Sequence, residues 1–185
     1  MRSLFSPLTA GAVLVVAVLV SSGAVAQTAV EPVTCAALTD APPARLIESC
    51  TARIEHPATG EGDRLDAMIT RAAAYHGSGQ TEKALAEIDT VISLDSGHAR
   101  AYRARGEILR QIGRMEAAFE SLNQAIRLEP DNATGYANRG NAFNIARKYD
   151  RAIEDYNEAL RLKPDFAQAY SDRGAAWYFM SEYQK

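Results

Sequence analysis

The sequence predicts an all-α solenoid of antiparallel helix pairs, because it repeats itself every 34 residues over more than half of its length. Bulky apolar residues, small residues and prolines recur together at this distance. The first set is Tyr102, Gly106, Leu109, Ala118, Leu122, Ala125 and Pro130, and the second is Tyr136, Gly140, Phe143, Ala152, Tyr156, Ala159 and Pro164. Stacked helical repeats ordinarily present a binding surface, so we ask first what binds.

The spacing within each repeat places the recurring residues on two helices. Repeat places 4, 8 and 11 share one face of a first helix, and places 20, 24 and 27 share one face of a second helix. Gly106, Gly140 and Gly174 fall inside the first helices, where glycine costs about 1 kcal/mol relative to alanine. We therefore expect the paired helices to approach closely there, with Ala118 and Ala152 as the small facing residues. The residues expected to fill the surrounding volume are Tyr102, Leu122, Tyr136 and Tyr156.

These residues are those of the tetratricopeptide repeat, which the sequence strongly resembles. Residues 99–132 and 133–166 match its pattern at every place named above, and residues 65–98 match it more loosely. Residues 167–185 match the beginning of a further, partial copy. The resemblance implies a right-handed superhelical solenoid whose first helices line a concave groove for a protein or peptide partner.

The first 26 residues are typical of a secretory signal peptide. Arg2 is their only charge, an apolar run extends from Leu8 to Val20, and small residues precede Gln27. The run has about 13 residues, fewer than the roughly 20 of a membrane-spanning helix; an uncleaved anchor is the alternative. We expect an exported protein, periplasmic or secreted, with no membrane contact after cleavage.

Two cysteines precede the repeats. Cys35 lies in a predicted leader, residues 27–42, and Cys50 in a capping helix and loop predicted for residues 43–64. Export implies an oxidising environment, in which a bridge would stabilise the protein by about 3 kcal/mol. This arrangement also resembles the N-terminal segment of exported bacterial tetratricopeptide proteins. We predict a Cys35–Cys50 disulfide, with two independent thiols as the alternative.

The sequence offers no catalytic or metal-binding pattern. His56, His76 and His98 are isolated, without a partner at the spacing of a zinc-binding helix. We expect Glu154 and Asp155 on the solvent face of a second helix. The formal net charge is −3 without a basic stripe, which disfavours nucleic-acid binding. We therefore expect no enzymatic activity, cofactor, metal or nucleic-acid partner.

The resemblance assigns the groove to repeat places two, five, six, nine, twelve and thirteen. Eight predicted groove residues follow from it: Arg103, Glu107, Arg110, Asn138, Asn141, Asn144, Asp172 and Tyr178. Asparagine amides can donate to and accept from a peptide backbone, and arginines favour an acidic partner. A solvated face without function is the alternative. Glu107, Gln168 and Asp172 do not fit the carboxylate clamp of chaperone-binding family members.

Four arginines recur at repeat place seven, where the family more often has leucine: Arg71, Arg105, Arg139 and Arg173. Their stems can cover apolar surface while the guanidinium groups reach an acidic neighbour or a carbonyl. We expect a structural role for them instead of ligand binding.

Aromatic residues crowd near the end of the sequence. We expect either a fragment of a longer repeat protein or self-association through Trp177, Phe179 and Tyr183. The predicted function is a non-catalytic periplasmic scaffold that binds a protein or peptide partner through its concave groove. The alternatives are a targeting arm of a longer enzyme truncated at residue 185 and a self-associating structural module.

Overall fold

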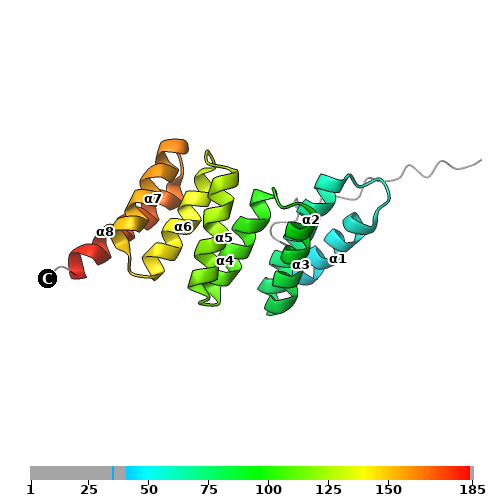
Figure 1. The fold of residues 1–185 in the computed structure, drawn as a ribbon. Coiled ribbons are helices and arrows are strands. Elements are labelled where there is room, and N and C mark those ends of the chain that lie inside the picture. Colours follow the sequence, from blue (N-terminus) through cyan, green and yellow to red (C-terminus); the bar gives the residue numbers. More distant parts are fainter. Residues whose placement is uncertain (1–34, 36–40, 184–185) are drawn as a thin grey trace, which may run out of the picture. The chain divides into compact units, whose positions relative to one another are not determined.

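The computed structural model describes Cys35 and residues 41–183, which belong to one compact unit (Figure 1). The predicted signal peptide and most of the predicted leader lie outside these residues. The described part is all-helical, as predicted, without a strand. Its eight helices are α1 (Pro43–Glu55), α2 (Glu61–Gly77), α3 (Thr81–Leu94), α4 (Ala99–Gln111), α5 (Met115–Leu128), α6 (Ala133–Ile145), α7 (Tyr149–Leu162) and α8 (Ala167–Tyr183).

The helices pack as antiparallel pairs, α2 with α3, α4 with α5, and α6 with α7, while α1 packs on α2 and α8 on α7. A short turn joins the two helices of each pair. The turns contain a residue with positive φ, which is Gly79, Gly113 or Arg147. Before α6, the Asn132 side chain accepts a hydrogen bond from the backbone N–H of Thr134 and caps the helix. Within residues 41–183, none of the helices has the length and apolarity that crossing a membrane requires.

The first helices of successive pairs form the inner surface of the unit. Helices α2, α4, α6 and α8 contact one another in chain order. Among the described residues, the second helices α3, α5 and α7 have no comparable contact with each other. The stack therefore curves toward the first helices. We call their exposed inner surface the groove.

Close helix approach explains two of the three recurring glycines. A Cβ atom on Gly106 would lie 2.6 Å from Leu122 Cγ, and one on Gly140 would lie 2.8 Å from Tyr156 Cε1. The expected close approach is present, and the buried Leu122 and Tyr156, expected in the surrounding volume, are the side chains that meet the two glycines; of Ala118 only a backbone oxygen lies nearby. Around Gly174 no described atom comes within 4 Å.

The place-seven arginines connect neighbouring second helices. Arg139 donates two hydrogen bonds to the Asp155 carboxylate on α7, at 2.8 and 2.7 Å, and one to Asn123 on α5, at 2.8 Å. Arg105 likewise contacts Ser121 on α5 and Asp89 on α3. Each guanidinium thus joins a second helix of its own repeat to that of the preceding repeat. These contacts agree with the predicted structural role.

The other two arginines fit the same scheme at its ends. Arg71 pairs with Glu87 on α3 and donates to Thr51 on α1. Arg173 donates to Asn157 on α7 at 2.7 Å. We call this series of contacts made by Arg71, Arg105, Arg139 and Arg173 the arginine ladder. The ladder extends from α1 to α8.

The expectation that Asp155 lies on the solvent face is wrong. Asp155 is only 5% exposed, whereas Glu154 is exposed as expected. Burial raises the pKa of Asp155, and the hydrogen bonds from Arg139 act in the opposite direction. Those hydrogen bonds raise the pKa of Arg139 against the effect of burial. The carboxylate is buried because an arginine from the adjacent first helix meets it.

Replacing Arg139 by alanine leaves the buried Asp155 carboxylate without its cation. We expect Arg139→Ala to lower the free energy of unfolding by about 3 kcal/mol. The matched control is Arg173→Ala, which removes a more exposed contact with a neutral amide and should cost less than about 1 kcal/mol. Urea unfolding measures both, and equal losses would contradict the role assigned to the Arg139–Asp155 pair.

The recurring glycines give a second test of the packing. We expect Gly140→Ala to destabilise the protein by about 1–3 kcal/mol, because the new methyl group meets the buried Tyr156 ring. Gly174→Ala has open space and should stabilise α8 by up to about 1 kcal/mol through helix propensity. Thermal unfolding of the two variants compares them, and effects of the same sign would show that the contact with Tyr156 is unimportant.

Candidate functional site

The structure places the predicted groove residues on three neighbouring first helices. Helix α4 carries three of them, α6 carries three and α8 carries two, and these helices contact one another in order. The residues are Arg103, Glu107 and Arg110 on α4, Asn138, Asn141 and Asn144 on α6, and Asp172 and Tyr178 on α8.

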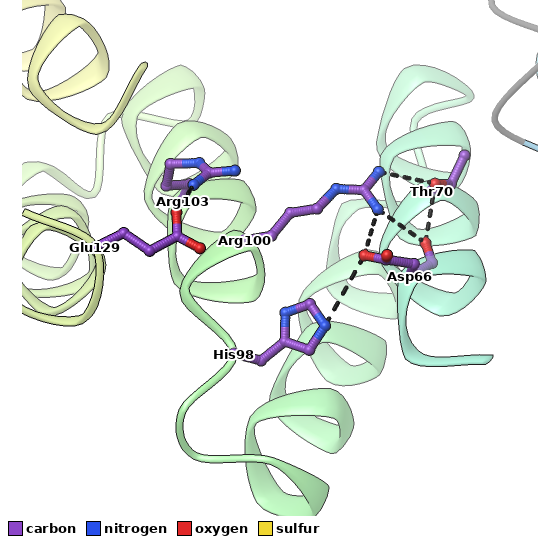
Figure 2. A network of polar contacts seen from close by, with 6 residues as sticks. All are labelled: Asp66, Thr70, His98, Arg100, Arg103 and Glu129. Atoms are coloured by element: carbon purple, nitrogen blue, oxygen red, sulfur yellow. Dashed lines mark hydrogen bonds and ion pairs between the residues drawn. The ribbon is translucent and has the colours of Figure 1, made fainter. Parts of the chain in front are cut away.

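A polar network crosses the start of the groove between the first two repeats. The Arg100 guanidinium donates to Asp66 at 2.5 Å and to Thr70 at 3.1 Å, both on α2 (Figure 2). His98 Nε2 lies 3.8 Å from the same carboxylate. Beside this network, Arg103 donates to Glu129 at 2.6 Å. Both arginines already have an acidic partner within the chain.

The third groove arginine is paired as well. Arg110 forms an ion pair with Glu107 one turn earlier on α4, and Gln111 donates to the same carboxylate at 2.6 Å. Burial raises the pKa of Glu107, but the hydrogen bonds from Arg110 and Gln111 outweigh it, so the net pKa is lowered. Glu107 therefore remains ionised and holds Arg110. An acidic partner would have to displace these internal carboxylates.

The asparagines of α6 are in a different state. The side chain of Asn138 makes no hydrogen bond to any described residue. Asn141 accepts a hydrogen bond from the Tyr156 hydroxyl at 2.6 Å through its side-chain oxygen, which leaves its NH₂ group available. The side-chain oxygen of Asn144 is buried and finds no partner among the described residues. This row of amides therefore has hydrogen-bonding capacity that the chain itself does not use.

The exposed aromatic residues of α8 lie on different faces. Trp177 is 51% exposed at repeat place 11, where Leu109 of α4 is 4% exposed beneath α5. Phe179 lies about 200° away around the helix and stacks on Tyr149, with ring centroids 6.1 Å apart. Tyr178 is exposed and meets the Phe179 ring edge to face. Self-association through Trp177, Phe179 and Tyr183 remains a prediction. Phe179 also lies at the edge of the groove, and the Tyr183 side chain is outside the described part.

A cavity at the turn between α6 and α7 was not predicted. It has a volume of about 300 Å³ and is lined by Asn144, Ile145, Arg147, Tyr149 and Phe179. Sequence reasoning missed Arg147 and Tyr149 because neither stands at a groove place of the repeat. The available signal was Arg147 itself, which occupies the place held by Gly79 and Gly113 in the two earlier turns.

Both cysteines are buried in one cluster with Ile54 and Ala67. Their sulfur atoms are not bonded to each other in the structure. Burial and the neighbouring Cys35 raise the pKa of the Cys50 thiol. The disulfide remains a prediction, for two side chains that lie in the same cluster.

Two family models match the sequence within this unit. A tetratricopeptide repeat model matches residues 133–166, and a second model, described as TPR repeat, matches residues 106–144. Residues 106–166 are therefore tetratricopeptide repeats. No curated protein sequence matched it.

Solved structures of other tetratricopeptide proteins share the fold. The crystal structure of MamA superposes with a TM-score of 0.60 at 23% identity, covering 75% of this chain and 79% of that one. The first TPR of Spaghetti (RPAP3), bound to the HSP90 peptide SRMEEVD, gives 0.59 at 18% identity, covering 63% and 93%. A Thermobaculum terrenum O-GlcNAc transferase mutant gives 0.57 at 24% identity, covering 60% and 22%. At these identities the likeness establishes the fold alone.

The ion pair between Arg110 and Glu107 can be tested by removing the Glu107 carboxylate. We expect Glu107→Gln to increase the affinity for an acidic probe peptide, heptaglutamate, by about fivefold, the value of an ion pair of about 1 kcal/mol. Glu158→Gln is the matched control, since Glu158 pairs with Arg161 at the same spacing on the outer helix α7. Isothermal titration at low salt measures the affinities. Equal changes in both variants would mean that Glu107 does not mask the groove arginine.

Proposed function

We propose that this protein is a non-catalytic, exported scaffold that holds an extended segment of a partner protein in its groove. The observation that carries the proposal is the contrast between the two kinds of groove residue. Arg100, Arg103 and Arg110 are engaged with carboxylates of the chain, while Asn138 and the NH₂ group of Asn141 are not engaged. The groove therefore offers side-chain amides that are free to bind a partner, whereas its arginines are already paired with carboxylates of the chain.

Free amides suit a peptide backbone. A side-chain amide supplies a donor and an acceptor in one plane, so it can match the N–H and C=O groups of an extended chain, whatever the sequence of that chain. The recognised segment would then bind through its backbone on α6. Acidic residues in it would contribute less, because each groove arginine must first give up its internal carboxylate.

Two kinds of support come from outside the groove itself. Residues 1–26 have the composition of a secretory signal peptide, which favours a periplasmic location. The RPAP3 repeat domain was solved with a bound peptide, so a unit of this fold and size can hold one.

A second candidate function is a targeting arm of a longer enzyme. One similar structure is an O-GlcNAc transferase, of which the matched repeats make up 22% of the chain. In such a protein the groove would still bind a partner segment, and the chemistry would reside in another domain. A longer reading frame with catalytic motifs would favour this candidate.

Asn138 gives the cleaner test of the groove, because Asn141 also holds the buried Tyr156 hydroxyl and its loss affects stability. We expect Asn138→Ala to weaken binding of a nonapeptide selected from a random display library by about five- to tenfold, at unchanged unfolding free energy. Asn157→Ala on the outer helix α7 is the control and should bind as the unmodified protein does. Fluorescence anisotropy measures the affinities, and an unaffected Asn138→Ala variant would argue against amide recognition in the groove.

A further inference from the structure

The cavity between the α6–α7 turn and α8 differs in character from the rest of the groove. Ile145 and Phe179, both large and apolar, are 54% and 44% exposed at its wall. Tyr149 completes an aromatic side by stacking on Phe179. Large apolar side chains exposed together around a concave surface mark a binding site more often than a solvated one.

One polar group lies at the same cavity. Asn144 is one of the residues that line it, and its side-chain oxygen is buried without a partner. A buried acceptor without a hydrogen bond is unfavourable, so a rotation of the amide that brings this oxygen to a donor of a ligand gains a hydrogen bond. The cavity therefore combines apolar walls with a single acceptor.

The backbone at this cavity carries a cost that the other repeats avoid. Arg147 has a φ of 56°, in the left-handed region, at the place where Gly79 and Gly113 have φ values of 83° and 76°. Residues other than glycine are disfavoured in this conformation. Arg147 nevertheless occupies the turn, and it is one of the residues that line the cavity. Of the three turns, only this one has a residue with a side chain at the place of positive φ.

We propose that this cavity, which we call the side-chain pocket, receives one aromatic or branched apolar side chain of the segment bound in the groove. The inference rests on the proposed function, and it adds the chemistry of the partner. The amide row of α6 leads directly into the pocket, because Asn141, Asn144 and Ile145 follow each other along the helix. The backbone N–H beside the anchored side chain donates to the Asn144 oxygen.

The recognised segment is therefore an extended peptide with a large apolar residue at one fixed position. Neither a fully acidic peptide nor a hydrophilic one satisfies the pocket. Specificity comes from this residue, since backbone contacts with the amides do not distinguish sequences.

The pocket can be tested without a groove ligand, using N-acetylphenylalaninamide as the probe and N-acetylglutaminamide as its polar counterpart. We expect saturable NMR shifts of the Ile145 methyl and Asn144 side-chain resonances with the first compound only. Ile145→Asp should weaken the response about tenfold, because it places a charge in the apolar wall. In that variant the Asn144 resonances report the binding. Leu94→Asp, at an exposed leucine outside the pocket, is the matched control and should leave the response unchanged. No saturable shift, or an undiminished response of Ile145→Asp, would overturn the proposal.

The variant Arg147→Gly distinguishes a role of Arg147 in ligand binding from an effect on the stability of the fold. It should raise the midpoint of thermal unfolding, because the left-handed strain is removed, while it weakens binding of N-acetylphenylalaninamide. Loss of both stability and binding would show only structural damage and would overturn the role assigned to Arg147.

Selection from a random nonapeptide library then separates the pocket from the groove. We expect selected peptides to share a large apolar residue at one position, and Ile145→Asp to lose this preference while it still selects peptides. Selected peptides without an apolar preference would overturn the pocket and leave the proposed function standing. Probe binding at Ile145 with no selected peptide would overturn the proposed function and leave the pocket as a small-molecule site.

Discussion

The structure depends on arginines at one repeat place of the first helices, two of which, Arg105 and Arg139, join second helices whose backbones do not contact each other. Arg139 is the clearest case, since it reaches Asp155 ahead of it and Asn123 behind it. The backbones of the first helices contact one another, whereas those of the second helices lie further apart as the stack curves. A long side chain with several donors in a fixed plane can span that separation. The curvature that forms the groove separates the second helices, and the arginines of the ladder bridge that separation.

The ladder also bears on the character of the groove. Its arginines are held away from the inner surface by partners on the second helices, and the arginines that do face inward are paired with Asp66, Glu129 and Glu107. What remains for a partner is the amide row of α6 and the apolar side-chain pocket beside it. These two features differ in what they recognise, because amides match any extended backbone and an apolar pocket selects a side chain. Affinity and specificity would thus arise at two adjacent sites, the amide row on α6 and the pocket between the α6–α7 turn and α8.

Periodicity made the helical fold predictable, since the recurring residues are the ones that pack between helices. Gly140 was predictable as a point of close approach, and Tyr156 as one of the residues that fill the volume around it. The direct contact between the two was not predictable, because one period says which residues recur and not which atom meets which. Asp155 was misjudged because charge alone suggests solvent; its burial depends on an arginine sixteen residues earlier in sequence. Trp177 and Phe179 were grouped by sequence proximity, although α8 turns them to opposite faces. The side-chain pocket was missed because it forms where a turn, an outer helix and α8 meet.

The central claim is that a partner segment lies along α6 on the inner surface of the stack. Hydrogen–deuterium exchange of the protein, with and without a library-selected nonapeptide, tests this directly because it needs no substitution. The account predicts slower exchange in α4, α6 and α8 on binding, with the largest change in α6 around Asn138 and Asn144, and little change in α3, α5 and α7. Protection confined to the outer helices α5 and α7 would contradict it.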